Sequence, residues 1–240
     1  MIVAIEGQDG IGKTSAINRI NEFMHLYKYG MKFPAYNYRP INTFITDSDY
    51  VKNTSKLAIE TFFTSKSFIE RIDALKRFDL MHTIDKYLYM NEISKVQETG
   101  DIYLFDRYCL SQAVYSKSCA EILLEDYDDL YFGSGYGVAR GLIKDLWYDV
   151  GNTIYLLPKI TLTIVFVADS NTVKERQGTR TNDLMDMQVR LQNKVNNAYV
   201  NKMFTEEYSN SEYTVTINTT GMDVSTMAKT IQDTISRYIN

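Results

Sequence analysis

An eight-residue segment near the start of the chain, GQDGIGKT at Gly7 to Thr14, constrains the fold more than any other feature. It lies between a short apolar run at residues 1–5 and a stretch from Thr14 to Tyr29 whose apolar residues recur at helical spacing. A glycine-rich loop between a strand and a helix can curl its backbone N–H groups around phosphate oxygens. The sequence therefore predicts a nucleoside triphosphate site formed by Gly7, Gln8, Asp9, Gly10, Ile11, Gly12, Lys13 and Thr14.

Polar and charged residues in the loop and at Asp106–Arg107 are predicted to bind phosphate and Mg²⁺. Lys13 reaches the terminal phosphates, and the Thr14 hydroxyl is a ligand for Mg²⁺. A second ligand is expected from Asp106, which ends an apolar run, and Arg107 beside it can clamp a phosphate with two hydrogen bonds. Structural alternatives stay open: Asp9 suits a tight turn as well as a ligand hydroxyl, and Asp106 with Arg107 suits a buried ion pair.

The order of predicted elements determines the fold class. Strands that alternate with helices imply right-handed crossovers and a three-layer α/β fold, in which a parallel sheet lies between helices and ligands bind at the carboxyl ends of the strands. After the first helix we expect a short element at Met31 to Phe33, a polar loop through Asp47, helices from Ser48 to about Ser65 and from Phe68 to Gln97, and a strand at Ile102 to Phe105. There follow a helix from Cys109 to Leu124, an irregular insertion at 125–137, a helix around Val138 to Tyr148, a strand at Ile160 to Val167, a short helix, a long helix to about Glu207, a strand at Tyr213 to Ile217 and a last helix from Asp223.

A polar break, ERQGTRTND, follows the long apolar strand and its short helix. We interpret residues 176–186 as a small lid whose Arg176 and Arg180 close over transferring phosphates and exclude water. For this segment alone, a solvated helix end is the better alternative. The lid is favoured because the phosphate loop and the Asp106–Arg107 pair occur in the same chain.

Composition excludes several classes of protein. The 240 residues suffice for a single domain, 1–240, and 26 Lys and Arg against 30 Asp and Glu give a net charge of −4, which argues against a nucleic-acid-binding surface. The apolar runs are too short for a membrane span, and the start of the chain does not resemble a cleaved leader. Cys109 and Cys119 are too few for a disulfide framework, and with His25 and His82 they give no metal-binding spacing. We expect a soluble protein of the cytoplasm, or of the host cytoplasm if the chain is viral.

Taken together, the motifs resemble one known family. IEGQDGIGKT at Ile5 to Thr14 resembles the EGxDGxGKT loop of the thymidylate kinases, which are P-loop nucleoside monophosphate kinases. Phe33-Pro34 resembles their FP turn at the second strand, and DRYCLSQAVY at Asp106 to Tyr115 resembles their DRYxxSxxAY stretch. Leu156 to Arg180 resembles their PKPDLTIYLDV strand with the helix and arginine lid that follow, so the resemblance runs almost from end to end.

The resemblance implies a reaction and a set of residue roles. The reaction is transfer of the γ-phosphoryl group of ATP, with Mg²⁺, to a deoxynucleoside 5′-monophosphate, in a homodimer whose subunit has five parallel strands. By the same similarity, Asp9 would hold the 3′-hydroxyl of the acceptor, Arg107 its phosphate and Ser111 the base region, while Tyr115 would pack where a ribose 2′-hydroxyl would lie. Gly10 stands where some members carry an arginine, so the catalytic cations would be Lys13, Arg107, Arg176 and Arg180.

The base pocket departs from the family pattern. His82 and Lys86, four residues apart on one helix face, stand where the family has a base-stacking Phe and a base-binding Arg. A shifted register brings in Arg77 or Phe78. Near the Phe33-Pro34 turn, Arg39 is the nearest candidate for the arginine that grips the acceptor phosphate. Thymine, uracil and a broader set of bases all stay open.

Two rival functions share the phosphate loop. A deoxynucleoside kinase must deprotonate a neutral 5′-hydroxyl and therefore needs a carboxylate near the second strand, and none follows Phe33 until Asp47. A regulatory nucleotide-binding switch without turnover would have little use for paired lid arginines. Both alternatives are weaker than transfer to a monophosphate, which brings its own anionic oxygen and needs mainly to be positioned.

Overall fold

The computed structural model describes residues 1–27, 37–42, 49–96, 101–128, 135–177 and 189–238 of the chain. Its strands are β1 (Ile2–Glu6), β2 (Asn37–Asn42), β3 (Asp101–Asp106), β4 (Ile160–Val167) and β5 (Ser211–Asn218). They pair in parallel in the order β2-β3-β1-β4-β5. The predicted α/β class with a parallel sheet is therefore confirmed.

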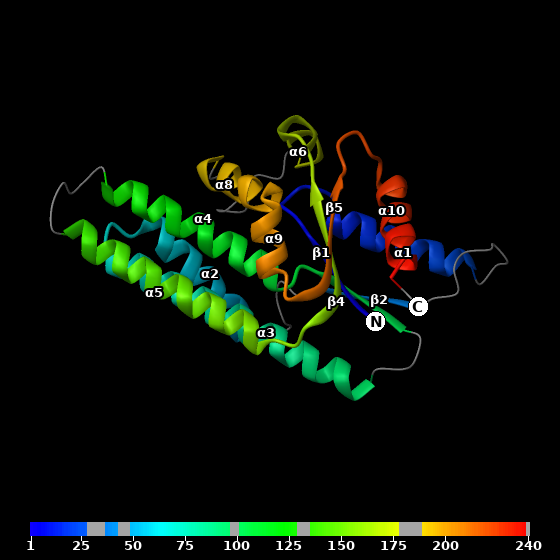
Figure 1. Ribbon diagram of the computed structural model, residues 1–240, viewed down its shortest axis with the longest axis horizontal. Coiled ribbons are helices and arrows are strands. Elements are labelled where there is room, and N and C mark those ends of the chain that lie inside the picture. Colours follow the sequence, from blue (N-terminus) through cyan, green and yellow to red (C-terminus); the bar gives the residue numbers. More distant parts are fainter. Residues whose placement is uncertain (28–36, 43–48, 97–100, 129–134, 178–188, 239–240) are drawn as a thin grey trace.

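Helices cover both faces of this sheet (Figure 1). The helices are α1 (Lys13–Tyr27), α2 (Asp49–Thr64), α3 (Phe68–Val96), α4 (Cys109–Asp128), α5 (Gly135–Leu156), α6 (Ser170–Gln177), α8 (Val189–Val200), α9 (Lys202–Tyr208) and α10 (Val224–Ser236). Alternate strand residues divide the core: Val3 and Ile5 of β1 face the cluster with α1 and α10, whereas Ala4 faces the cluster with α3, α4, α5, α8 and α9. This period of two is what a strand buried on both faces requires.

The edge strand β2 corrects one prediction, because it lies inside the segment expected to be a polar loop. Its sequence, NYRPIN, has no apolar alternation that would indicate a strand. At the edge of the sheet it pairs with β3 alone, and Pro40 is tolerated there because an edge strand can do without one N–H. The short element expected at Met31 to Phe33 lies outside the described residues.

The helices after β3 also differ from the predicted ones. Helix α4 continues to Asp128 and α5 begins at Gly135, so the described residues of the expected irregular insertion, 125–128 and 135–137, are helical. Gly135 and Gly137 weaken the helical signal, but tertiary packing outweighs it, since the α5 residues Leu146, Val150 and Ile154 are buried in the core. The long helix expected to end near Glu207 is divided into α8 and α9 at Asn201, whose side chain accepts a hydrogen bond from the Phe204 N–H at 3.2 Å.

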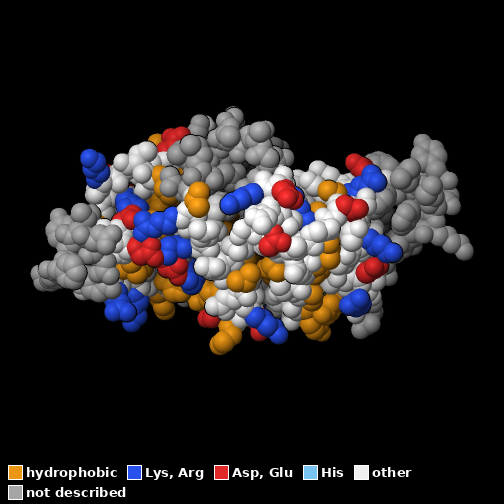
Figure 2. All heavy atoms as spheres, turned by 90° about the horizontal axis from the view of Figure 1, so that it is seen from above, with side chains coloured by type: hydrophobic (Ala, Val, Ile, Leu, Met, Phe, Trp, Pro, Cys, Tyr) orange, Lys and Arg blue, Asp and Glu red, His pale blue; other side chains and the backbone are white. Residues whose placement is uncertain are grey.

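Ion pairs join α4 to α8 at the surface. Arg190 contacts Glu125 and Asp126, and Lys194 contacts Glu125. On the face seen in Figure 2, acidic and basic side chains are interspersed. No helix among the described residues is long and apolar enough to cross a membrane. Both cysteines are buried and free.

Candidate functional site

The site forms where β1 and β3 end side by side. Ile5 of β1 is level with Asp106 of β3, and the glycine-rich loop leads from β1 into α1. Gly7 and Gly12 have φ angles of 142° and 99°, which side chains rarely adopt. A Cβ atom at Gly7 would lie 2.7 Å from the Phe166 carbonyl oxygen. The loop can therefore pass close to β4 only with glycine at this position.

Lys13 spans the loop from inside. Its ammonium donates hydrogen bonds to the carbonyl oxygens of Gly7 and Gln8, both at 2.9 Å. Burial lowers its pKa to about 8, and the positive charge of Arg107 acts in the same direction. An anion bound in the loop would replace these carbonyls with a charged partner.

Thr14 and Asp106 meet at the same edge of the sheet. The Thr14 hydroxyl donates a hydrogen bond to the Asp106 carboxylate, which brings together two hard oxygen donors from α1 and β3. The described residues contain no group of three or more His, Cys, Asp or Glu that could hold a metal ion. Mg²⁺ needs no such group, because it usually binds through one or two protein oxygens together with substrate phosphates and water. The residues therefore fit a magnesium ion brought by a nucleotide.

Arg107 lies at the centre of the site. Its φ angle is 78°, unusual for a residue with a side chain, and its backbone N–H donates to the Ile5 carbonyl at 3.0 Å. Its guanidinium contacts the Asp9 carboxylate and donates to the Ser111 hydroxyl at 3.1 Å. Although burial opposes ionisation of Asp9, the Arg107 guanidinium and the Lys13 ammonium hold the pKa of this carboxyl below its ordinary value. The strained turn thus fixes a charged guanidinium between the phosphate loop and α4.

Tyr115 completes this cluster. Its hydroxyl donates a hydrogen bond to the Asp9 carboxylate, and its ring lies 5.4 Å from the Arg107 guanidinium carbon. Burial raises the pKa of Tyr115 well above its ordinary range, and the negative charge of Asp9 adds to this. The residues predicted to contact the sugar, the phosphate and the base region of an acceptor, Asp9, Tyr115, Arg107 and Ser111, therefore lie together.

Glu6 is a site residue that the sequence reasoning missed. Its carboxylate is fully buried at the end of β1 and accepts hydrogen bonds from the backbone N–H groups of Tyr108 at 2.6 Å and Ser111 at 3.3 Å. It also accepts from the hydroxyls of Ser111 and Tyr199, the second at 3.3 Å. Glu6 therefore fixes the start of α4 and the turn at Arg107. A single acid closing the apolar run IVAIE was the signal that could have identified it.

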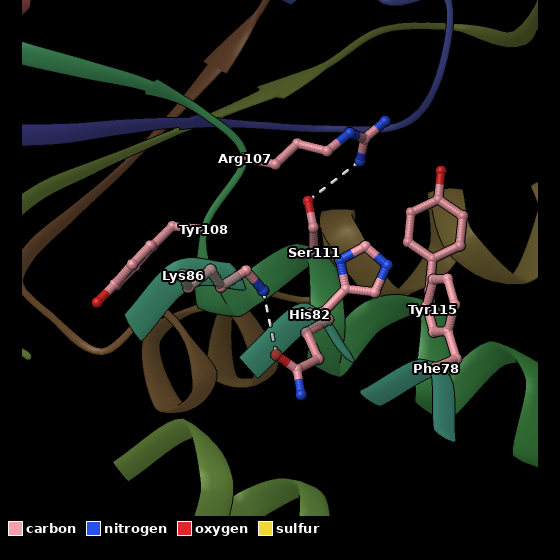
Figure 3. Close-up of a pocket in the computed structure, with 8 residues that line it drawn as sticks. Phe78, His82, Lys86, Arg107, Tyr108, Ser111 and Tyr115 are labelled. Atoms are coloured by element: carbon pink, nitrogen blue, oxygen red, sulfur yellow. Dashed lines mark hydrogen bonds between the residues drawn. The ribbon is translucent and has the colours of Figure 1, made fainter. Parts of the chain in front are cut away.

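A pocket opens beside Arg107 between α3 and α4 (Figure 3). Helix α3 contributes Phe78, His82 and Lys86, and the other wall is formed by Arg107, Tyr108, Ser111, Gln112 and Tyr115. The buried Lys86 ammonium donates to the Gln112 side-chain oxygen at 3.1 Å. Gln112, also missed, is held by donating to the Asp79 carbonyl at 3.1 Å and the Thr83 hydroxyl at 3.0 Å. The amide therefore fixes the position of the lysine in the pocket.

The structure places His82 and Phe78 together in this pocket, while Arg77 lies elsewhere. The rings of Phe78 and His82 are 4.2 Å apart in an edge-to-face arrangement. Arg77 is exposed and pairs with Asp73. Burial lowers the pKa of His82 to about 3, and the charges of Lys86 and Arg107 contribute, so its imidazole is neutral at pH 7.

Arg176, which was predicted to be a lid arginine, contacts the phosphate loop in this structure. It belongs to α6, and its guanidinium donates to the carbonyls of Ile11 at 2.9 Å, Thr219 at 2.6 Å and Met222 at 2.7 Å, and to the Thr219 hydroxyl at 3.1 Å. These bonds tie the phosphate loop to the segment between β5 and α10. Arg176 is thus a brace for the loop in this conformation.

Other predicted residues lie outside the described residues or in the edge strand β2. Arg180 and the rest of the expected lid from 178 to 186 lie outside the described residues, as do Phe33 and Pro34. Arg39 lies in β2, level with Tyr103 of β3. Their roles stay predictions.

The chain shares its fold, with this sheet order and these flanking helices, with solved structures of nucleoside and nucleotide kinases. No family model and no curated protein sequence matches the chain. Among solved structures, the chain is similar to thymidylate kinase from Candida albicans, with a TM-score of 0.62 over 98% of this chain and 91% of that one at 16% identity. It is also similar to deoxyadenosine kinase from M. mycoides with the products dCMP and dCDP bound, with a TM-score of 0.61 over 99% of this chain and 100% of that one at 13% identity. The same enzyme with bound dATP gives a TM-score of 0.57 at 14% identity, over 98% of this chain and 100% of that one. At such identities the likeness establishes the fold alone.

Proposed function

We propose that the chain is a deoxynucleoside monophosphate kinase that transfers the γ-phosphoryl group of ATP to a pyrimidine deoxynucleotide, dTMP or dUMP, to give the diphosphate. The observation that carries the proposal is the position of Arg107, a buried cation held between the phosphate loop and the pocket by Asp9 and Ser111. A buried guanidinium at this place suits an acceptor that brings its own negative charge. The acceptor phosphate binds Arg107, and its oxygen faces the terminal phosphate held by Lys13.

The phosphate loop supplies the donor half of the site. Lys13 exchanges its two carbonyl partners for the terminal phosphates of ATP. Thr14 and Asp106 would hold Mg²⁺, which neutralises charge on the phosphates when it is bound. Because the acceptor oxygen is already anionic, these residues act mainly by positioning and by charge. We retain Arg180 and the segment 176–186 as a lid in this proposal.

Asp9 and Tyr115 contact the acceptor sugar. The Asp9 carboxylate is ionised and partly exposed, so it can accept a hydrogen bond from the 3′-hydroxyl of a deoxyribose. The Tyr115 ring, fixed by its bond to Asp9, occupies space beside that group. Together they favour a deoxyribose over a ribose.

The base is read by a donor-rich pocket. Lys86 has three N–H donors and no acceptor, and the neighbouring His82 is neutral. The 4-keto oxygen of thymine or uracil accepts from this ammonium, whereas the 4-amino group of cytosine would direct hydrogens at it. Lys86→Ala should reduce the preference for dTMP over dCMP about tenfold or more while leaving the KM for ATP unchanged. Lys117→Ala on α4, which does not line the pocket, is the matched control. An unchanged base preference in Lys86→Ala would show that the base lies elsewhere.

A deoxynucleoside kinase is the second candidate, favoured by the likeness to deoxyadenosine kinase over the full length of that protein. Its acceptor is a neutral 5′-hydroxyl, which calls for a carboxylate base. The strand next to β3 ends in Asn42, level with Asp106, and β2 contains no Asp or Glu. Because β2 offers no carboxylate base, it favours a monophosphate acceptor over a nucleoside.

A panel of acceptors separates the candidates. Purified protein with ATP and Mg²⁺ is assayed with dTMP, dUMP, dCMP, dGMP, dAMP, thymidine and deoxyadenosine, and Lys13→Ala purified identically reports contaminating kinases. We expect diphosphate from dTMP or dUMP. Phosphorylation of the nucleosides alone would establish the second candidate, and absence of turnover with every acceptor would favour a nucleotide-binding switch. Sedimentation of the same preparation tests the homodimer that the family resemblance implies.

A further inference from the structure

The ring of Phe78 separates the acceptor pocket from a second cavity. That cavity lies between α2, α3 and α4, and among the described residues Phe78 alone lines both spaces. The other residues around the second cavity are all apolar or cysteine and include Phe62, Leu75 and Cys119. Phe78 is nearly fully buried, so its ring is held between the two.

The pocket has a polar end and an apolar end along α3. Lys86 follows Phe78 by eight residues, which is about 12 Å along a helix axis, and His82 lies midway. Figure 3 shows the three side chains pointing into the same space from one helix, with Lys86 and Phe78 at opposite ends. The bond from Lys86 to Gln112 marks the polar end.

A pyrimidine has edges that match these two ends. O2, N3 and the 4-substituent form a polar edge, and C5 and C6 form an apolar edge. Buried polar atoms need hydrogen-bond partners, so the polar edge lies toward Lys86 and Gln112. The C5 position then points toward Phe78 and the cavity behind it.

We propose that Phe78 sets the largest C5 substituent that the acceptor pyrimidine can carry, and that the apolar cavity behind it receives a larger apolar substituent once the ring is removed. The inference rests on the proposed function, since it assigns the base orientation in the same acceptor site. The ligand class is a deoxyuridine monophosphate with an apolar group at C5. Purines do not belong to this class, because their ring nitrogens and exocyclic groups would lie against an apolar lining without hydrogen-bond partners.

The test is a series of acceptors of increasing size at C5: dUMP, dTMP, and the 5-ethyl, 5-iodo and 5-(2-bromovinyl) derivatives of dUMP. Phe78→Ala is compared with wild type and with Phe62→Ala, which removes an equal ring from the far side of the cavity and leaves Phe78 in place. For each protein, kcat/KM for the bromovinyl derivative is divided by kcat/KM for dTMP. This ratio should be about tenfold or more higher in Phe78→Ala than in wild type, which is the discrimination that a hydrophobic pocket typically achieves for one or two carbon groups. Phe62→Ala and dGMP should show no such gain.

Three results would overturn the proposal: an unchanged ratio in Phe78→Ala, an equal gain in Phe62→Ala, or an equal gain for dGMP. If Phe78→Ala does not fold, Phe78→Leu is used in its place. A smaller rise in the same kcat/KM ratio is then expected, and an unchanged ratio would again contradict the proposal. Calorimetric binding of the same nucleotides without ATP tests the role of Phe78 separately from the proposed function. Wild type that phosphorylates no monophosphate refutes the proposed function, while the binding ratios of Phe78→Ala and wild type still decide the role of Phe78.

Discussion

Asp79 offers a quantitative test of the electrostatics beside the pocket between α3 and α4. It lies on α3 one turn before His82, and the residue is 5% exposed. One carboxyl oxygen accepts a hydrogen bond from the Ser116 hydroxyl, and the other has no hydrogen-bond partner among the described residues. Burial raises the pKa of Asp79 from 3.8 to about 7, although Ser116 and the positive charge of Lys86 act in the opposite direction. The folded chain therefore holds this carboxyl largely protonated below pH 7.

The raised pKa makes stability depend on pH in a defined direction. The folded state binds the proton more tightly than the unfolded chain, so the stabilising contribution is fully present below pH 3.8 and is lost as the pH rises through about 7. The gap between the two pKa values corresponds to roughly 4 kcal/mol. Between pH 5 and pH 7 the wild type should lose about 2 kcal/mol of unfolding free energy relative to Asp79→Asn, whose amide does not titrate.

The assay is urea unfolding at pH 5, 6 and 7, followed by the fluorescence of Trp147, the single tryptophan, which is stacked on Phe204. Asp73→Asn removes an exposed carboxylate from the same helix and is the matched control. A difference between wild type and Asp79→Asn that stays constant over this range would refute the argument that burial keeps Asp79 protonated.

The remaining predictions concern the phosphate loop and the turn at Arg107. ATP binding should weaken as the pH rises past about 8, because Lys13 then loses its proton in the free protein; a dissociation constant that is equal at pH 7 and pH 9 would count against this. Lys13→Ala should lower kcat/KM for ATP by about a hundredfold or more with an unchanged melting temperature, and a variant that fails to fold would contradict a role in phosphate binding alone. Glu6→Gln keeps an oxygen that can accept from backbone N–H groups, so its KM for the monophosphate should rise less than that of Glu6→Ala; equal values would remove the positioning role. Arg176→Ala should destabilise the fold by about 1–3 kcal/mol, since it leaves buried carbonyls without a donor, and a drop in kcat with unchanged stability would show that Arg176 leaves its brace during turnover.

Local signals account for the parts of the fold that the sequence predicts well. The run at Ile160 to Val167 consists entirely of β-branched residues, Leu and Phe, and β4 has the predicted bounds. Helix α3 begins at the predicted Phe68 and ends one residue before the predicted Gln97. The phosphate loop is equally local, because its glycines, lysine and threonine act within eight consecutive residues.

Long-range contacts account for the parts that the sequence does not predict. Strand β2 exists because its backbone pairs with β3, and its own side chains give no such signal. Tyr199 donates to Glu6 across 193 residues of sequence, and Gln112 reaches Lys86 from a different helix. The same holds for Arg176, whose position in ERQGTRTND predicts a lid, whereas the fold brings it against carbonyls near residues 11 and 220.

The central claim is that this site phosphorylates a monophosphate and leaves the nucleoside alone. One competition experiment tests it most directly. Equal concentrations of dTMP and thymidine are incubated with the wild-type protein, ATP and Mg²⁺ in two parallel reactions. Only dTMP is labelled in the first reaction and only thymidine in the second, so the initial rates of dTDP and dTMP formation are measured separately. The product ratio equals the ratio of the two kcat/KM values. The account predicts that labelled dTMP is converted to dTDP at least a hundredfold faster than labelled thymidine is converted to dTMP. Faster conversion of thymidine, with no dTDP from labelled dTMP, would contradict it.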